Sequence, residues 1–78
     1  MKTENFCYFF KANAIYLRGK HKLTQQNVAD LLNIKRSLVG AIEEGRTIGL
    51  QNVYAYSRHF NVTLDDLLTK IITAKDLK

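Results

Sequence analysis

The breaks in the apolar pattern of this 78-residue chain all carry residues that start or end helices. The chain has no proline, so each break depends on glycine, asparagine or a capping hydroxyl. Thr24 and Thr63 precede apolar runs with helical spacing, and their hydroxyls can accept from the free amides of a first turn. Asn33, Gly45 and Asn61 follow such runs, where a left-handed residue ends a helix. These features predict an all-helical chain.

Five helices follow from this pattern. The second, third and fourth are expected over residues 25–32, 36–44 and 50–60, and the fifth over about 64–76. The first is expected to end at Gly19 and carries the apolar residues Phe6, Phe9, Phe10, Ala14 and Leu17. The expected buried side of the fourth helix comprises Leu50, Val53, Tyr54, Ser57 and Phe60. Both sets are predicted to pack in the core.

The length and net charge of the chain limit the functions that it can have. The chain has the length of one domain, residues 1–78. Its net charge of +5 favours a polyanionic partner, either nucleic acid or a membrane surface. However, no run approaches the ~18–20 apolar residues of a membrane helix, and residues 1–5 lack the order of a signal peptide. The charges also fall in turns and at helix starts, so we expect a cytoplasmic protein that does not bind membranes.

Residues 24–45 have the organisation of a helix-turn-helix, two short helices joined by a tight turn. Ala29 is the small residue at the crossing, and Val39 and Ile42 are spaced to pack the third helix onto the second. Lys35 stands where the N-cap of the third helix belongs, although a lysine side chain cannot accept a hydrogen bond. Local rules are often broken at functional sites. The outward face of the third helix is therefore the candidate functional surface.

The segment 23–46, LTQQNVADLLNIKRSLVGAIEEGR, resembles the Cro/repressor (XRE-like) helix-turn-helix family. The same pattern continues upstream at Leu17 and Arg18 and downstream over residues 60–68. The resemblance thus covers about residues 6–70. It implies an all-α, compact five-helix bundle with a helix-turn-helix, of the lambda-repressor-like DNA-binding type.

The resemblance also implies roles for individual residues. The third helix would lie in the major groove of DNA, with its first turn against the base edges. Gln25 would bond a backbone phosphate and support Arg36, while Arg18 and Glu43 would form a structural ion pair. Contacts to the phosphates are expected from Gln25, Gln26, Lys35, Arg46 and Thr47.

Base contacts are expected from Arg36, Ser37, Gly40 and Ala41. Arg36 is the strongest of these, because its guanidinium matches guanine O6 and N7 in a bidentate pair. Ser37 can donate or accept and discriminates less. Gly40 and Ala41 permit close approach or contact with a thymine methyl group, and a glycine within a helix costs ~1 kcal/mol against alanine.

The fifth helix is predicted to form a homodimer interface, because its apolar residues cover a wider face of the helix than burial in the core alone requires. The residues assigned to this interface are Leu68, Ile71 and Ile72. A two-fold dimer would place its recognition helices ~34 Å apart on a pseudo-palindromic operator. We therefore predict a DNA-binding transcriptional regulator that acts as a repressor, requires no cofactor and joins the nucleoid when bound to DNA.

Two other functional classes remain to be compared with DNA binding: an enzyme and a protein-binding module. An enzyme is not expected, because His21, His59 and Cys7 show no catalytic pattern and no cluster with metal-ligand spacing. The serious alternative is an antitoxin-like or adaptor module, which would use the same fold mainly to hold another protein.

Overall fold

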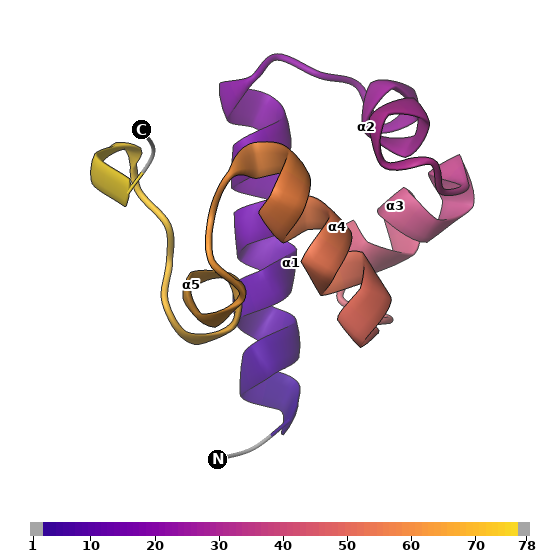
Figure 1. Cartoon of the computed structure of the whole chain (residues 1–78). Coiled ribbons are helices and arrows are strands. Elements are labelled where there is room, and N and C mark those ends of the chain that lie inside the picture. Colours follow the sequence, from indigo (N-terminus) through magenta and orange to yellow (C-terminus); the bar gives the residue numbers. More distant parts are fainter. Residues whose placement is uncertain (1–2, 77–78) are drawn as a thin grey trace.

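The computed structural model describes residues 3–76, which form five α-helices, one short 3₁₀ helix and no strand. The helices are α1 (Thr3–Lys20), α2 (Gln25–Leu32), α3 (Arg36–Glu43), α4 (Leu50–Phe60) and α5 (Leu64–Thr69), followed by the 3₁₀ helix η1 (Ala74–Asp76) (Figure 1). The predicted all-α fold with five helices is confirmed.

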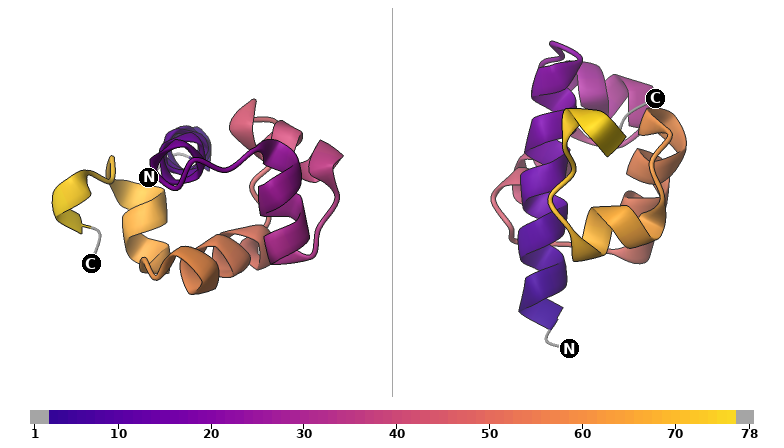
Figure 2. Two further views of the ribbon diagram at one scale, coloured as in Figure 1. Left: turned by 90° about the horizontal axis from the view of Figure 1, so that it is seen from above. Right: turned by 90° about the vertical axis from the view of Figure 1, so that its left-hand side faces the viewer.

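The long helix α1 lies between the helix-turn-helix and the C-terminal helices, along one edge of the molecule (Figures 1 and 2). Viewed from above, α2 and α3 lie on one side of α1, whereas α5 and η1 lie on the other, and α4 connects the two sides (Figure 2). Phe10, Ala14 and Leu17 of α1 are buried. The other core side chains are Val28, Ala29, Val39, Ile42, Val53, Tyr56, Phe60, Val62, Leu67 and Ile72. One core therefore joins the helix-turn-helix to the C-terminal helices.

Local capping signals determine most of the helix ends. The bounds of α2 and α4 agree with the prediction, and Asn33 and Asn61 adopt the left-handed conformation after them. Helix α3 ends at Glu43, one residue earlier than predicted. Gly45 follows with φ of 75°, and its amide bonds the Ile42 carbonyl at 3.1 Å. This bond and that from Arg46 N to Ala41 O at 2.9 Å form a Schellman motif.

The end of α1 differs from the prediction. Gly19 lies within the helix, which continues to Lys20. The left-handed residue is Lys22, with φ of 56°. Its amide donates to Gly19 O at 3.0 Å, and the Leu23 amide donates to Arg18 O at 3.0 Å. These two bonds end α1 in the same way as those at Gly45 end α3. Helix α1 therefore ends before the left-handed residue Lys22, and the nearest glycine, Gly19, does not end it.

The end of α5 also differs, since the predicted helix over 64–76 stops at Thr69. Lys70 is extended, with φ of −152°. The cause is the buried side chain of Asn13 in α1, whose Nδ2 donates to Leu67 O at 3.0 Å and to Lys70 O at 2.8 Å. Its Oδ1 accepts from Ile72 N at 2.8 Å. A polar residue within the apolar stripe of α1 was the sequence signal for this role.

The predicted buried side of α4 is right for Val53 and Phe60 and wrong for Leu50 and Tyr54. Val53, Tyr56 and Phe60 are buried, whereas Leu50 and Tyr54 are 73% and 54% exposed. The buried side is fixed by aromatic packing, because the Tyr56 ring lies edge-on to Phe10 with centroids 5.3 Å apart. Leu50 and Tyr54 instead line a shallow apolar groove of about 300 Å³ together with Gln51 and Leu64.

Candidate nucleic-acid interface

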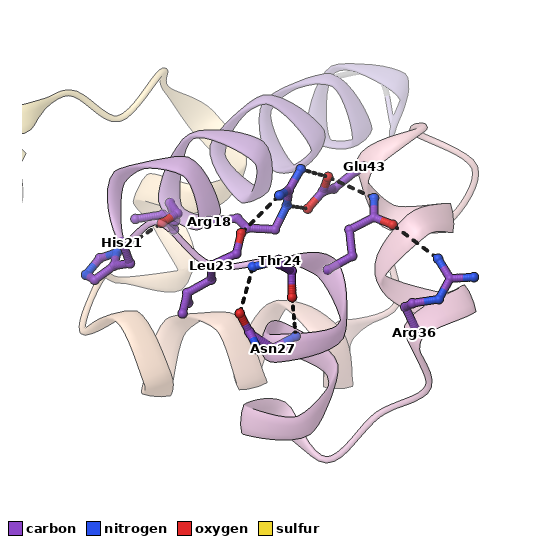
Figure 3. Close-up of polar contacts among 9 residues, drawn as sticks. Arg18, His21, Leu23, Thr24, Asn27, Arg36 and Glu43 are labelled. Atoms are coloured by element: carbon purple, nitrogen blue, oxygen red, sulfur yellow. Dashed lines mark hydrogen bonds and ion pairs between the residues drawn. The ribbon is translucent and has the colours of Figure 1, made fainter.

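The start of α2 is closed by bonds within the protein. The Thr24 hydroxyl accepts from Asn27 N at 3.0 Å, and the Asn27 side chain accepts from Thr24 N at 2.9 Å (Figure 3). Together they form a reciprocal capping box. Thr24 was predicted, but its partner was missed because asparagine stands where the box more often has Glu or Gln. The spacing of Thr24 and Asn27 was the available signal.

The start of α3 has no such closure. Lys35 has the extended backbone of an N-cap, with φ of −76° and ψ of 144°, yet its side chain makes no capping hydrogen bond. Lys35, Arg36 and Ser37 are all exposed. A positively charged side chain therefore lies beside a helix N-terminus, and both attract anions such as phosphate.

Gly40 and Ala41, one turn further along α3, are half-buried. A methyl group built on Gly40 would meet only the Gln25 Oε1 atom, at 3.9 Å, which is an ordinary van der Waals distance. Packing within the protein therefore does not require glycine here.

Beneath this surface lies the ion pair of Arg18 and Glu43. Arg18 Nε donates to Glu43 Oε2 at 2.7 Å and Nη2 donates to Oε1 at 3.0 Å, while Nη1 donates to the Leu23 carbonyl at 3.0 Å (Figure 3). The hydrogen bond to Glu43 raises the pKa of Arg18 above its ordinary value, although burial acts in the opposite direction. The pair links α1 to the end of α3 across the turn before α2.

Gln25 connects this ion pair with Arg36. Its Nε2 donates to Glu43 Oε1 at 3.2 Å, and its Oε1 accepts from Arg36 Nη1 at 3.5 Å. The support of Arg36 by Gln25 that the family resemblance implied is therefore present in the structure. The bond between Gln25 and Glu43 was missed, because it depends on three helices bringing their side chains together.

The remaining predicted phosphate contacts are spread around the helix-turn-helix. Gln26 and Arg46 are exposed, and Thr47 is half-buried. Gln26 donates to Asp30 on its own helix at 2.9 Å, and Arg46 pairs with Glu44 at 2.6 Å. Both side chains of the Arg46–Glu44 pair are more than half exposed, so the pair contributes little stability and Arg46 can exchange it for a phosphate.

A comparison with known protein families identifies the family to which this chain belongs. The sequence matches the family described as Helix-turn-helix over residues 15–67. The chain belongs to the Cro/XRE-type helix-turn-helix family. Neither a search of curated proteins nor a search of solved structures found a match. The helix-turn-helix assignment makes this a DNA-binding domain of the kind found in transcription regulators. Among its described residues, no helix has the length and apolar character needed to cross a membrane.

The residues predicted for a helix-turn-helix dimer are not equally accessible. Ile71 is 46% exposed and Leu68 is half-buried. Ile72 is 1% exposed and belongs to the core, with its amide bonded to Asn13. A side chain buried in its own subunit cannot contact a second one without unfolding, so the assignment of Ile72 to the dimer interface is wrong.

The two histidines of this helix-turn-helix protein pack against one residue. The rings of His21 and His59 lie with centroids 5.2 and 4.9 Å from that of Phe60. His21 Nδ1 also lies 2.9 Å from the Leu17 carbonyl. Within residues 3–76, no three His, Cys, Asp or Glu side chains gather where they could hold a metal ion.

Proposed function

We propose that this protein binds double-stranded DNA sequence-specifically, with α3 in the major groove, and represses transcription without catalysing a reaction. The observation that carries the proposal is the exposed Arg36 on the first turn of α3, supported by Gln25. An arginine at this place can reach base edges once the start of α3 enters the groove. The net charge of +5 adds attraction to the phosphates. The protein would act in the cytoplasm, at the nucleoid.

The contacts divide into those that read bases and those that position the protein. Base contacts are assigned to Arg36, Ser37, Gly40 and Ala41, of which Arg36 supplies most of the discrimination. Phosphate contacts are assigned to Gln25, Gln26, Lys35, Arg46 and Thr47. The open start of α3 supports the assignment of Lys35, whose charge has no capping role within the protein.

Selection from a randomised duplex pool near physiological salt, followed by affinity measurement with Arg36→Ala, tests the proposal. Lys75→Ala is the control, because it removes the same charge from η1, on the opposite side of the molecule from α3 (Figures 1 and 2). We expect Arg36→Ala to lose about tenfold or more in specific affinity and Lys75→Ala to lose little. Equal losses would contradict base reading by Arg36. If no site is enriched and the affinity only falls steeply with salt, the net charge explains the binding, and the antitoxin-like or adaptor module becomes the better-supported function.

Repression itself is measured with a reporter that carries the selected site in its promoter.

We also propose that the protein binds a pseudo-palindromic operator as a homodimer. Leu68 and Ile71 remain as the proposed contact residues near the end of α5. Ile71→Arg should abolish cooperative binding to two half-sites spaced ~34 Å apart but leave binding to one half-site unchanged. Leu50→Arg, in the apolar groove at the start of α4, is the matched variant. Loss of cooperativity with Leu50→Arg alone would place the dimer contact in that groove.

A further inference from the structure

The Gln25 side chain lies between two groups of opposite hydrogen-bonding character. On one side is the Glu43 carboxylate, 3.2 Å from Gln25 Nε2. On the other is the Arg36 guanidinium, 3.5 Å from Gln25 Oε1. A carboxylate only accepts and a guanidinium only donates, so an amide satisfies both in one orientation, with its nitrogen toward Glu43.

Glu43 is suited to impose that orientation because it is itself fixed. Its residue is 8% exposed, and both carboxylate oxygens accept from Arg18 in a bidentate pair. Arg36, by contrast, is exposed, and its 3.5 Å contact is long for a hydrogen bond. Gln25 therefore connects the fixed Glu43 carboxylate with the exposed Arg36 side chain.

We infer that Glu43 is a positioning residue for DNA recognition: held by Arg18, it turns the Gln25 amide so that Oε1 directs the Arg36 guanidinium toward its base pair. The inference rests on the proposed function. Ordering an arginine side chain on binding costs conformational entropy, and directing it beforehand lowers that cost for the matching base. One Gln25 Nε2 hydrogen points to Glu43, and the other can still reach a phosphate. The buried ion pair therefore contributes to base preference as well as to stability.

A double-mutant cycle tests the link from Gln25 to Arg36. Gln25→Met keeps the length of the side chain and removes both hydrogen bonds. Gln26→Met is the matched control, because Gln26 is the neighbouring glutamine and bonds only Asp30 among the contacts described for its side chain. The quantity measured is the affinity ratio between the preferred base pair opposite Arg36 and its three substitutes. Gln25→Met should lower this ratio about three- to tenfold in the wild-type background and less than about twofold in Arg36→Ala. Gln26→Met should weaken all sites equally.

The link from Glu43 is tested with Glu43→Gln. Arg18 donates to both oxygens of the wild-type carboxylate, so the NH₂ group of the new amide faces an Arg18 N–H in either orientation and the bidentate hold on this side chain is lost. The acceptor for Gln25 Nε2 is then no longer fixed, and the base-pair ratio should fall, at most as far as in Gln25→Met. If Glu43→Gln does not fold, Glu43→Asp retains the charge but is one methylene too short to reach both partners. If neither folds, the Glu43 link is tested with Arg18→Lys, which keeps the positive charge but cannot hold both carboxylate oxygens in the same planar pair, and the base-pair ratio should again fall; an unchanged ratio would overturn the inference.

The outcomes separate this inference from the proposed function. A folded Glu43 variant with the wild-type base-pair ratio, or a Gln25→Met effect that persists undiminished in Arg36→Ala, would overturn the inference. A uniform loss at all sites would show a purely structural role and would also overturn it. If the wild-type protein itself has no base preference, the proposed function fails first.

Discussion

The two helices of the helix-turn-helix begin in opposite ways. At the start of α2, Thr24 and Asn27 satisfy each other's backbone amides. At the start of α3, Lys35 occupies the same structural position and offers no acceptor. An N-cap side chain contributes about 0.5–2 kcal/mol to the free energy of unfolding. The protein therefore has this stabilisation at the start of α2 and lacks it at the start of α3. The difference teaches that the backbone amides at the two starts are treated differently: α2 is capped within the protein, and α3 has no side-chain cap and leaves its first amides open to a phosphate.

Giving α3 the cap that it lacks should produce the largest effect. Lys35→Asp places a capping carboxylate at a backbone conformation that already suits one. We expect the free energy of unfolding to rise by about 1 kcal/mol in urea titrations. Affinity for DNA should fall about tenfold or more, because a cation at a phosphate becomes an anion.

Lys35→Ala separates the two contributions of this change. It should lower affinity and reduce the slope of affinity against salt by about one, without raising stability. If Lys35→Asp binds DNA as well as the wild type, the start of α3 does not face a phosphate.

Opening the start of α2 should produce the next largest effect. Thr24→Ala removes the acceptor for Asn27 N, and we expect the free energy of unfolding to fall by about 1 kcal/mol. Thr24→Ser, which keeps the hydroxyl, is the control and should remain near wild type. A loss of DNA affinity in Thr24→Ala that exceeds its loss of folded protein would show that the Thr24 cap contributes to DNA binding beyond the side chains of Gln25 and Gln26, and the contrast between the two starts would disappear.

A smaller gain in stability is expected on the exposed side of α3. Gly40→Ala should raise the free energy of unfolding by about 0.5–1 kcal/mol, because the new methyl group meets Gln25 at an ordinary distance. Gly19→Ala in α1 should give a similar gain, since nothing lies within 4 Å of its methyl group. Only Gly40→Ala should weaken DNA binding. Equal DNA affinity in both variants would mean that α3 does not approach DNA closely at Gly40.

The smallest effect at neutral pH concerns Tyr56, buried close to the ion pair. Its hydroxyl makes no hydrogen bond with any described residue. Burial, and then the nearby negative charge of Glu43, raise the pKa of Tyr56 above its ordinary value of 10.0. The unfolded chain therefore ionises Tyr56 first, and the stability that this group contributes is constant below about pH 10 and is lost as the pH rises further.

Tyr56→Phe removes this titration. Its free energy of unfolding should match or slightly exceed that of wild type at pH 7, because the hydroxyl is unpaired. Above pH 10 the variant should lose less stability than wild type in parallel urea titrations. Identical pH profiles would show that the Tyr56 hydroxyl reaches water in solution.

Features governed by neighbouring residues could be predicted from the sequence. Thr24, Asn33 and Asn61 lie within four residues of the backbone groups that they bond at the helix ends, so the bounds of α2 and α4 were predicted correctly. The end of α5 was not, because Asn13 lies 53 to 59 residues from the groups it bonds there. Lys22 was missed for a different reason, since a lysine in the left-handed conformation costs about 1–2 kcal/mol and carries no sequence signal.

The same distinction applies to the candidate site. The exposure of Arg36 and its contact with Gln25 agreed with expectations that the family resemblance supplied. The bond from Gln25 to Glu43 required knowledge of how α1, α2 and α3 pack, since the partners come from separate helices. Periodicity likewise predicted that Leu50 and Tyr54 are buried. In the structure α4 is rotated so that Tyr56 packs against Phe10, and Leu50 and Tyr54 are exposed.

Asn13 also sets the order in which the domain can be completed during its synthesis. A ribosome that has made α1 through α4 has not yet made the backbone groups of residues 66–72 that Asn13 bonds. Until then the amide must remain hydrated, and the middle of α1 cannot be sealed from water. The hydrogen bonds of Asn13 can therefore be completed only after a segment synthesised more than 50 residues later has been made.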